Sequence, residues 1–151
     1  MGVPVEFISG KGPVFADSIC KNEELRLNSD GALKKLEYVF EATSLIKASI
    51  DVPLIGFTGS PWTLFVYLYY GESPKNHDEL NSFLKLKSQN THSYLEQLTE
   101  ITKDYVHAQI EAGADCIQIF DSWGGLLDEK YQELSLNSVS YTHLRAHETL
   151  V

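Results

Sequence analysis

Two short motifs place glycine, hydroxyl and aromatic residues directly after apolar runs of the sequence. The first is GFTGSPWTLFVY, from Gly56 to Tyr67, and the second is FDSWGG, from Phe120 to Gly125. Hydroxyl and phenol groups can donate hydrogen bonds to a ligand, and the free N–H groups at the start of a helix attract anions. Tyr67 follows Ser60 by two helical turns, so both residues share one helix face. We therefore expect a binding site at these motifs.

Asp121 and Ser122 come directly after the second apolar run. The Asp121 carboxylate can serve as an acid, as a base or as a helix cap, and the sequence leaves these three roles open. No histidine has a spacing from which a Ser–His–Asp triad could be certified. His143 and His147 have the i, i+4 spacing of helical metal ligands, but they lie in a terminal stretch of unusual composition, so we predict no metal site there.

The elements that must position these motifs point to an α/β fold. Apolar runs at 52–57 and 116–120 predict two strands, the first of them covered on both faces as in a parallel sheet. Ser60 and Pro61 have the pattern of an N-cap and first helical residue, which explains the first motif equally well without a ligand. The other predicted elements are a loop or hairpin over the first 27 residues and helices over about 29–50, 61–71, 78–87 and 91–112.

The composition is that of one folded domain with an acidic surface. The chain has 151 residues, a net charge of −9 and 43% hydrophobic residues. Its charge argues against nucleic acid and anionic membranes as partners. No apolar run has the length of a membrane span, and no signal-peptide pattern follows Met1. Cys20 and Cys116 form no CxxC motif; we expect Cys116 to be a buried thiol in a reducing, cytoplasmic setting.

Together these stretches resemble the uroporphyrinogen decarboxylase family of tetrapyrrole biosynthesis. The resemblance runs from Met1 to about Leu136 and implies an α/β fold, a partial (β/α)8 TIM barrel with parallel strands and crossover helices over 1–137. It implies a carboxy-lyase that needs no metal or organic cofactor and that is usually a homodimer. The stretches that carry it are Pro53–Leu64 with Tyr67, Ala108–Asp115, Gln118–Gly125 and Tyr131–Leu136.

The resemblance also implies the substrate and the residues that meet it. Family members remove carbon dioxide from the four acetate side chains of uroporphyrinogen III and release coproporphyrinogen III. Tyr67 matches the family tyrosine that hydrogen-bonds near the catalytic carboxylate, and it is the candidate catalytic residue. Ser122 matches a Ser/Thr that contacts a substrate carboxylate, and Phe120 an aromatic that lines the pocket. These three are the candidate substrate-binding residues, with no metal ligand.

The family's other functional residues have no counterpart in this chain. By the resemblance, its catalytic aspartate and RQAGR-like arginines correspond to positions before Met1, and a GHG-type histidine to positions after Leu136. Arg26 and Arg145 are the only arginines, too few to hold a polycarboxylate. We therefore expect an internal segment covering about barrel elements two to four, with 138–151 a non-native tail that resembles translated sequencing-adapter sequence.

Three other hypotheses stay open. The polypeptide as written can be an inactive, partly folded piece with exposed strand edges and no enzymatic function. The parent can instead be a zinc-dependent corrinoid methyltransferase of the same superfamily, although nothing here pairs a histidine with a cysteine for zinc. An autonomous flavodoxin-like binding module is the third.

Overall fold

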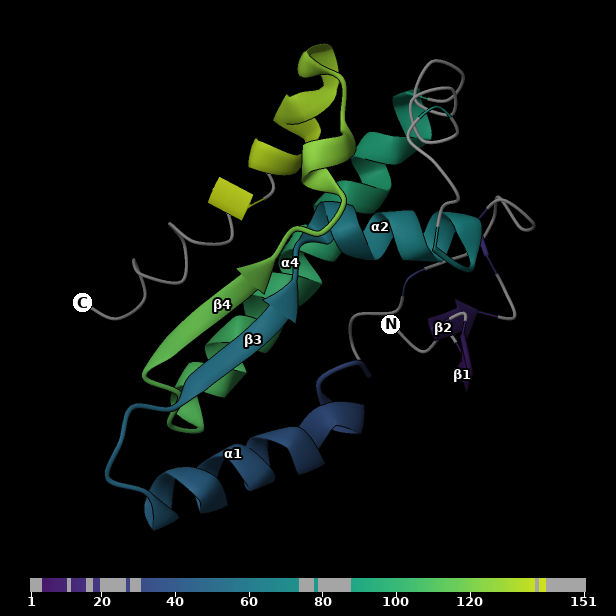
Figure 1. The fold of residues 1–151 in the computed structure, drawn as a ribbon. Helices are drawn as coiled ribbons and strands as arrows, with labels where there is room; N and C mark the ends of the chain where they lie inside the picture. The colour runs from purple at the N-terminus through teal and green to yellow at the C-terminus, as the bar shows by residue number, and fades with distance from the viewer. Residues whose placement is uncertain are drawn as a thin grey trace.

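The computed structural model describes residues 4–10, 12–15, 18–19, 27, 31–73, 78, 88–137 and 139–140. Figure 1 shows strands β3 and β4 side by side, with helix α4 behind them. The elements are β1 (Val5–Ile8), β2 (Gly12–Phe15), η1 (Lys34–Leu36), α1 (Glu37–Ser49), β3 (Ile55–Gly59), α2 (Pro61–Tyr70), α4 (Ser88–Glu111), β4 (Cys116–Phe120), η2 (Gly124–Leu126) and η3 (Glu129–Tyr131).

Strands β3 and β4 form a parallel pair, as the element order predicted. Their register runs from Ile55 opposite Cys116 to Gly59 opposite Phe120. The crossover between them contains α2 and α4, and α4 packs against β3. The molecule therefore has the predicted α/β arrangement of parallel strands with crossover helices.

The β3–β4 sheet is covered on one face only among the described residues. Gly56 and Thr58 of β3 are buried, and an added Cβ on Gly56 would lie 2.7 Å from Gln109 Oε1 of α4. Side chains alternate along a strand, so their neighbours point away from α4. Ile55, Phe57 and Phe120 are accordingly 61%, 63% and 52% exposed.

Two sequence expectations about the strands are wrong for this reason. The first strand was predicted to be covered on both faces, and Cys116 was predicted to be a buried thiol, but Cys116 is exposed on the open face.

The first strand also begins at Ile55 rather than Val52. Pro53 has no N–H for a sheet ladder, which keeps the residues before Ile55 out of the strand.

Helix α2 is bounded by the predicted caps. The Ser60 Oγ accepts from the backbone N–H of Thr63 at 3.0 Å, Pro61 is the first helical residue, and Gly71 closes the helix at a φ of +77°. A positive φ of this size is easily adopted by glycine, which has no Cβ. The core lies mainly between α2 and α4 and includes Ile19, Trp62, Phe65, Val66, Leu68, Tyr94, Leu95, Leu98 and Leu127.

The N-terminal elements agree only in part with expectation. Strands β1 and β2 form the predicted hairpin, with Val5 opposite Phe15. The predicted helix over 29–50 is shorter, because η1 begins at Lys34 and α1 at Glu37. The predicted caps at 29–30, the helix at 78–87 apart from Asp78, and the tail at 138 and 141–151 lie outside the described residues. No helix in the described ranges is long and apolar enough to cross a bilayer.

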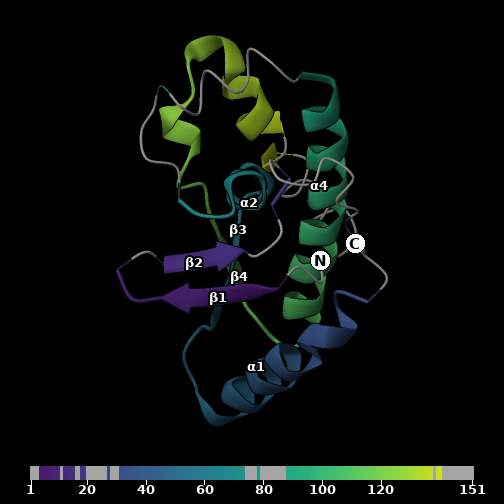
Figure 2. The ribbon, with the colours of Figure 1, turned by 90° about the vertical axis from the view of Figure 1, so that its right-hand side faces the viewer.

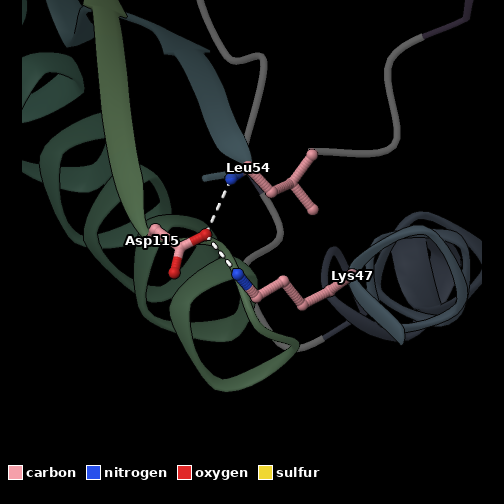
Figure 3. A network of polar contacts seen from close by, with 3 residues as sticks. All are labelled: Lys47, Leu54 and Asp115. Carbon is pink, nitrogen blue, oxygen red and sulfur yellow. Dashed lines mark hydrogen bonds and ion pairs between the residues drawn. The ribbon is translucent and has the colours of Figure 1, made fainter. Parts of the chain in front are cut away.

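A polar network joins α1 to the N-terminal ends of both sheet strands. The Asp115 carboxylate oxygen Oδ2 accepts from Lys47 Nζ of α1 at 2.7 Å and from the backbone N–H of Leu54 at 2.7 Å (Figure 3). These bonds, that from Lys47 first, lower the pKa of Asp115 below its ordinary value of 3.8. In both ribbon views α1 lies at the end of the molecule opposite the yellow-green segments that follow β4 (Figures 1 and 2).

Candidate functional site

The two predicted motifs meet at the C-terminal edge of the β3–β4 sheet. Strand β3 ends at Gly59 and α2 begins directly after Ser60, while β4 ends at Phe120. The Ser60 backbone N–H donates to the Phe120 carbonyl at 2.8 Å. Because parallel strands end at the same edge of a sheet, the loops after them form one polar surface.

Asp121 is the centre of the hydrogen bonds at this edge. Its Oδ1 accepts from Ser60 Oγ at 2.5 Å and from Thr63 Oγ1 at 3.2 Å, and its Oδ2 accepts from Ser135 Oγ. The carboxylate therefore joins separate segments of the chain, a role beyond the three that the sequence left open. Sequence reasoning missed Ser135 as a partner, because no sequence pattern predicts a contact between a loop residue and a helical residue 14 positions later.

Tyr67 lies on α2 and is half-buried. Its ring meets the Trp123 ring edge to face, with centroids 6.0 Å apart and planes at 72°. Within the described residues its hydroxyl has no hydrogen-bond partner. Trp123 was not among the predicted site residues, although it stands in the FDSWGG motif beside Ser122.

Phe120 and Ser122 flank Asp121 on the second loop. Phe120 is the last residue of β4 and faces the open side of the sheet, where its ring lies 6.2 Å from that of Phe57. Ser122 is exposed, and in the described part of the chain its hydroxyl has no partner. The structure therefore puts all three predicted residues on the elements that meet at this edge, with Trp123 linking Tyr67 to the second loop.

Gly124 is required by the same loop. An added Cβ would clash with the Asp121 carboxylate and would lie 3.0 Å from Ser135 Oγ. The Gly124 backbone N–H also donates to the Asp121 carbonyl at 3.3 Å. Gly124 is therefore needed in the second motif because the Asp121 carboxylate approaches its Cα closely, and not because of a positive φ.

Away from the sheet edge, the described residues offer an open groove but no cluster of metal ligands. Across the described ranges, no three His, Cys, Asp or Glu side chains lie close enough together to hold a metal ion. An open groove of about 670 Å³ lies between α1 and α4, lined by Phe40, Glu41, Ser44, Leu45, Ala108, Glu111 and Ala112. None of its lining residues belongs to the two loops after β3 and β4.

Parallel α/β proteins place their sites at the carboxyl ends of their strands, which is where this chain collects hydroxyl, phenol and aromatic side chains. The family model described as uroporphyrinogen decarboxylase (URO-D) matches residues 1–150. The chain belongs to the uroporphyrinogen decarboxylase family, and its curated relatives are named uroporphyrinogen decarboxylase.

Among these relatives, the uroporphyrinogen decarboxylase of Francisella philomiragia is 44% identical over an alignment of 144 residues that covers 93% of this chain and 42% of the relative. That of Sulfurimonas denitrificans is 41% identical over 141 residues, covering 89% of this chain and 41% of the relative. The chain thus spans about two fifths of their length.

A solved structure of similar fold is a methyltransferase from Methanosarcina mazei. The TM-score is 0.71 at 20% identity, and the match covers 94% of this chain and 43% of that one. At this identity the likeness concerns the fold alone.

Proposed function

We propose that this chain is the part of a uroporphyrinogen decarboxylase that contributes two walls of the substrate pocket. The observation that carries the proposal is the 44% identity to a relative of that name, together with the meeting of both family motifs at one sheet edge. In this proposal the whole enzyme converts uroporphyrinogen III to coproporphyrinogen III, acts without a cofactor in the cytoplasm and forms a homodimer.

The decarboxylation requires the protein to bind the substrate and to transfer protons. At each acetate side chain the bond to the carboxylate carbon breaks, carbon dioxide leaves, and the electron pair enters the protonated pyrrole. A proton then reaches the remaining CH2 carbon and gives a methyl group, and the ring loses the proton that had activated it, so that one proton is taken up for each carbon dioxide released. The roles of the protein are to hold a carboxylate against the pyrrole N–H groups and to supply these protons.

Three side chains of this chain suit the binding part of that task. The Tyr67 hydroxyl is free within the described residues to donate toward the family's catalytic carboxylate, and the exposed Ser122 hydroxyl to donate toward a substrate carboxylate. The Phe120 ring is 52% exposed and offers an apolar surface to the macrocycle. Tyr67 is the candidate catalytic residue because it matches the family tyrosine that hydrogen-bonds near the catalytic carboxylate.

A partial (β/α)8 barrel explains the one-sided burial of the sheet. In such barrels the helices cover the outer face of the strands and the inner face lines the interior. Helix α4 covers the face of Gly56 and Thr58, so Phe57 and Phe120 would line the inside. The fold likeness to the Methanosarcina mazei protein supports this assignment.

The test is a chimera in which residues 1–136 replace the matching segment of the Francisella philomiragia enzyme. We expect the chimera to form coproporphyrinogen and the 151-residue chain alone to form none, because the resemblance puts the catalytic aspartate and arginines outside it. A folded chimera without product would contradict the proposal. Stoichiometric zinc and methyl-transfer activity in the parent enzyme would favour the corrinoid methyltransferase instead.

The variant Tyr67→Phe in the same chimera tests the catalytic assignment. It removes the hydroxyl and keeps the ring that meets Trp123. We expect kcat/KM to fall by roughly 10- to 100-fold, in the range of one lost catalytic hydrogen bond, with unchanged unfolding. An unchanged kcat/KM would remove Tyr67 from the proposal while leaving the reaction itself in place.

A further inference from the structure

Asp121 joins three segments that are distant in sequence. Ser60 and Thr63 belong to the start of α2, Asp121 follows β4, and Ser135 lies in the helical turn at 132–137. The carboxylate bonds to all three hydroxyls.

The direction of these hydrogen bonds is set by the carboxylate. The carboxylate oxygens accept, so each of the three hydroxyls donates its hydrogen bond to Asp121. Two of the hydroxyls then accept in turn: Ser60 Oγ from the Thr63 N–H at 3.0 Å, and Thr63 Oγ1 from the Trp123 N–H at 3.5 Å. Bonds aligned in one direction polarise and strengthen one another.

The partners of Asp121 are buried and depend on it. Ser60, Thr63 and Ser135 are 0%, 6% and 3% exposed. A buried hydroxyl that loses its acceptor is costly, because water cannot replace the bond. Removal of the carboxylate is therefore expected to move the loops rather than to leave three hydroxyls unpaired.

We propose that Asp121 is a positioning residue, which holds Ser122 and the Tyr67–Trp123 pair in place against each other. Ser122 is its neighbour in the chain, and Tyr67 lies one turn after Thr63 on α2. Trp123 is bound to the same cluster through its backbone N–H. The part of this inference that concerns catalysis rests on the proposed function, whereas the part that concerns geometry does not.

The geometric part is tested on the 151-residue chain by NMR. In the unsubstituted chain we expect a nuclear Overhauser contact between the Tyr67 and Trp123 rings, which lie 6.0 Å apart between centroids. Asp121→Ala should abolish it. Glu133→Gln, the control, removes the same charge from an exposed residue near Ser135 and should keep the contact. A contact that survives in Asp121→Ala, or is missing from the unsubstituted chain, would overturn the inference.

A milder pair of variants guards against simple unfolding. Asp121→Asn keeps one acceptor oxygen for Ser60 and Thr63 and loses the acceptor for Ser135, while Ser135→Ala removes that third bond alone. If the cluster acts as described, both variants weaken the ring contact by a similar factor and their combination adds little more, as coupled residues do. Fully additive effects would contradict a shared role.

The catalytic part is tested in the active chimera described above. Misplaced binding groups cost up to about 100-fold in rate, so we expect Asp121→Ala to lower kcat/KM by roughly 10- to 100-fold, mostly through a higher KM, and Asp121→Asn to restore much of the loss. Equal KM in all variants of an active chimera would overturn the catalytic part. An inactive parent chimera would count against the proposed function instead, and the NMR result would stand separately.

Discussion

The backbone N–H of Ser60 donates to the backbone carbonyl of Phe120 at 2.8 Å, so the residue that caps α2 is held by the last residue of β4. This bond continues the β3–β4 ladder past its end and brings the two loops together independently of their side chains. The side chains then add the Asp121 cluster on top of that backbone frame. The candidate site is therefore built on the hydrogen-bonded end of the sheet.

Gly56→Ala should destabilise the chain. An added Cβ would lie 2.7 Å from both Gln109 Oε1 and Ile117 Cδ1, and 3.3 Å from the Ala114 Cβ. Overpacking of this kind costs about 1–3 kcal/mol. Urea unfolding followed by circular dichroism should show a lower midpoint. Gly125→Ala, where the added Cβ meets nothing within 4 Å, is the control and should unfold like the parent; equal midpoints for both variants would contradict the α4–β3 contact.

Gln109→Met should loosen α4 from β3. The Gln109 side chain bonds both backbone groups of Phe57: Oε1 accepts from its N–H at 3.1 Å and Nε2 donates to its carbonyl at 3.2 Å. Losing a buried partner costs about 1–3 kcal/mol. Gln97→Met on the exposed face of the same helix should change the free energy of unfolding by less than about 0.5 kcal/mol. The hydrogen-exchange rate of the Phe57 amide should rise in Gln109→Met and stay unchanged in Gln97→Met. A slowly exchanging Phe57 amide in Gln109→Met would argue that Gln109 does not hold α4 to β3.

Protonation of Asp115 should lower the stability of the chain in acid. Its pKa is lower in the folded state than the ordinary 3.8, mainly through the bond from Lys47. A lowered folded pKa stabilises the fold fully above the unfolded pKa, and this contribution is lost as the pH falls through the folded value. Urea unfolding at a series of pH values below 4 should therefore show a steeper loss for the parent than for Asp115→Asn. Asp104→Asn, an exposed change of the same charge, should follow the parent curve.

The open face of the sheet should drive self-association of the 151-residue chain. Phe57 and Phe120 are 63% and 52% exposed and in ring contact, and exposed apolar patches promote association. Sedimentation velocity should show larger species at higher concentration, and Phe57→Ser should reduce them. Leu45→Ser on α1, at 71% exposure in the parent, should have a smaller effect. A monomer with a sharp, cooperative melt at all concentrations would contradict this and the hypothesis of a partly folded piece.

Local signals in the sequence predicted several elements correctly. Ser60, Pro61 and Gly71 bound α2 as expected, because caps act over one helical turn. The strand at 116–120 follows from an apolar run, and the parallel pairing follows from the order of helices and strands. The family motifs carried the assignment of Tyr67, Phe120 and Ser122, whose roles stay proposals.

Other properties required the tertiary structure. The sequence determined the elements, their order and the family, because these depend on periodicity, caps and motif identity within short stretches. Only the fold decided that Cys116 is exposed, that Asp121 gathers Ser60, Thr63 and Ser135, and that Trp123 meets Tyr67. Burial and hydrogen-bond partners are properties of neighbours in space, and these neighbours come from segments 14 to 61 residues apart.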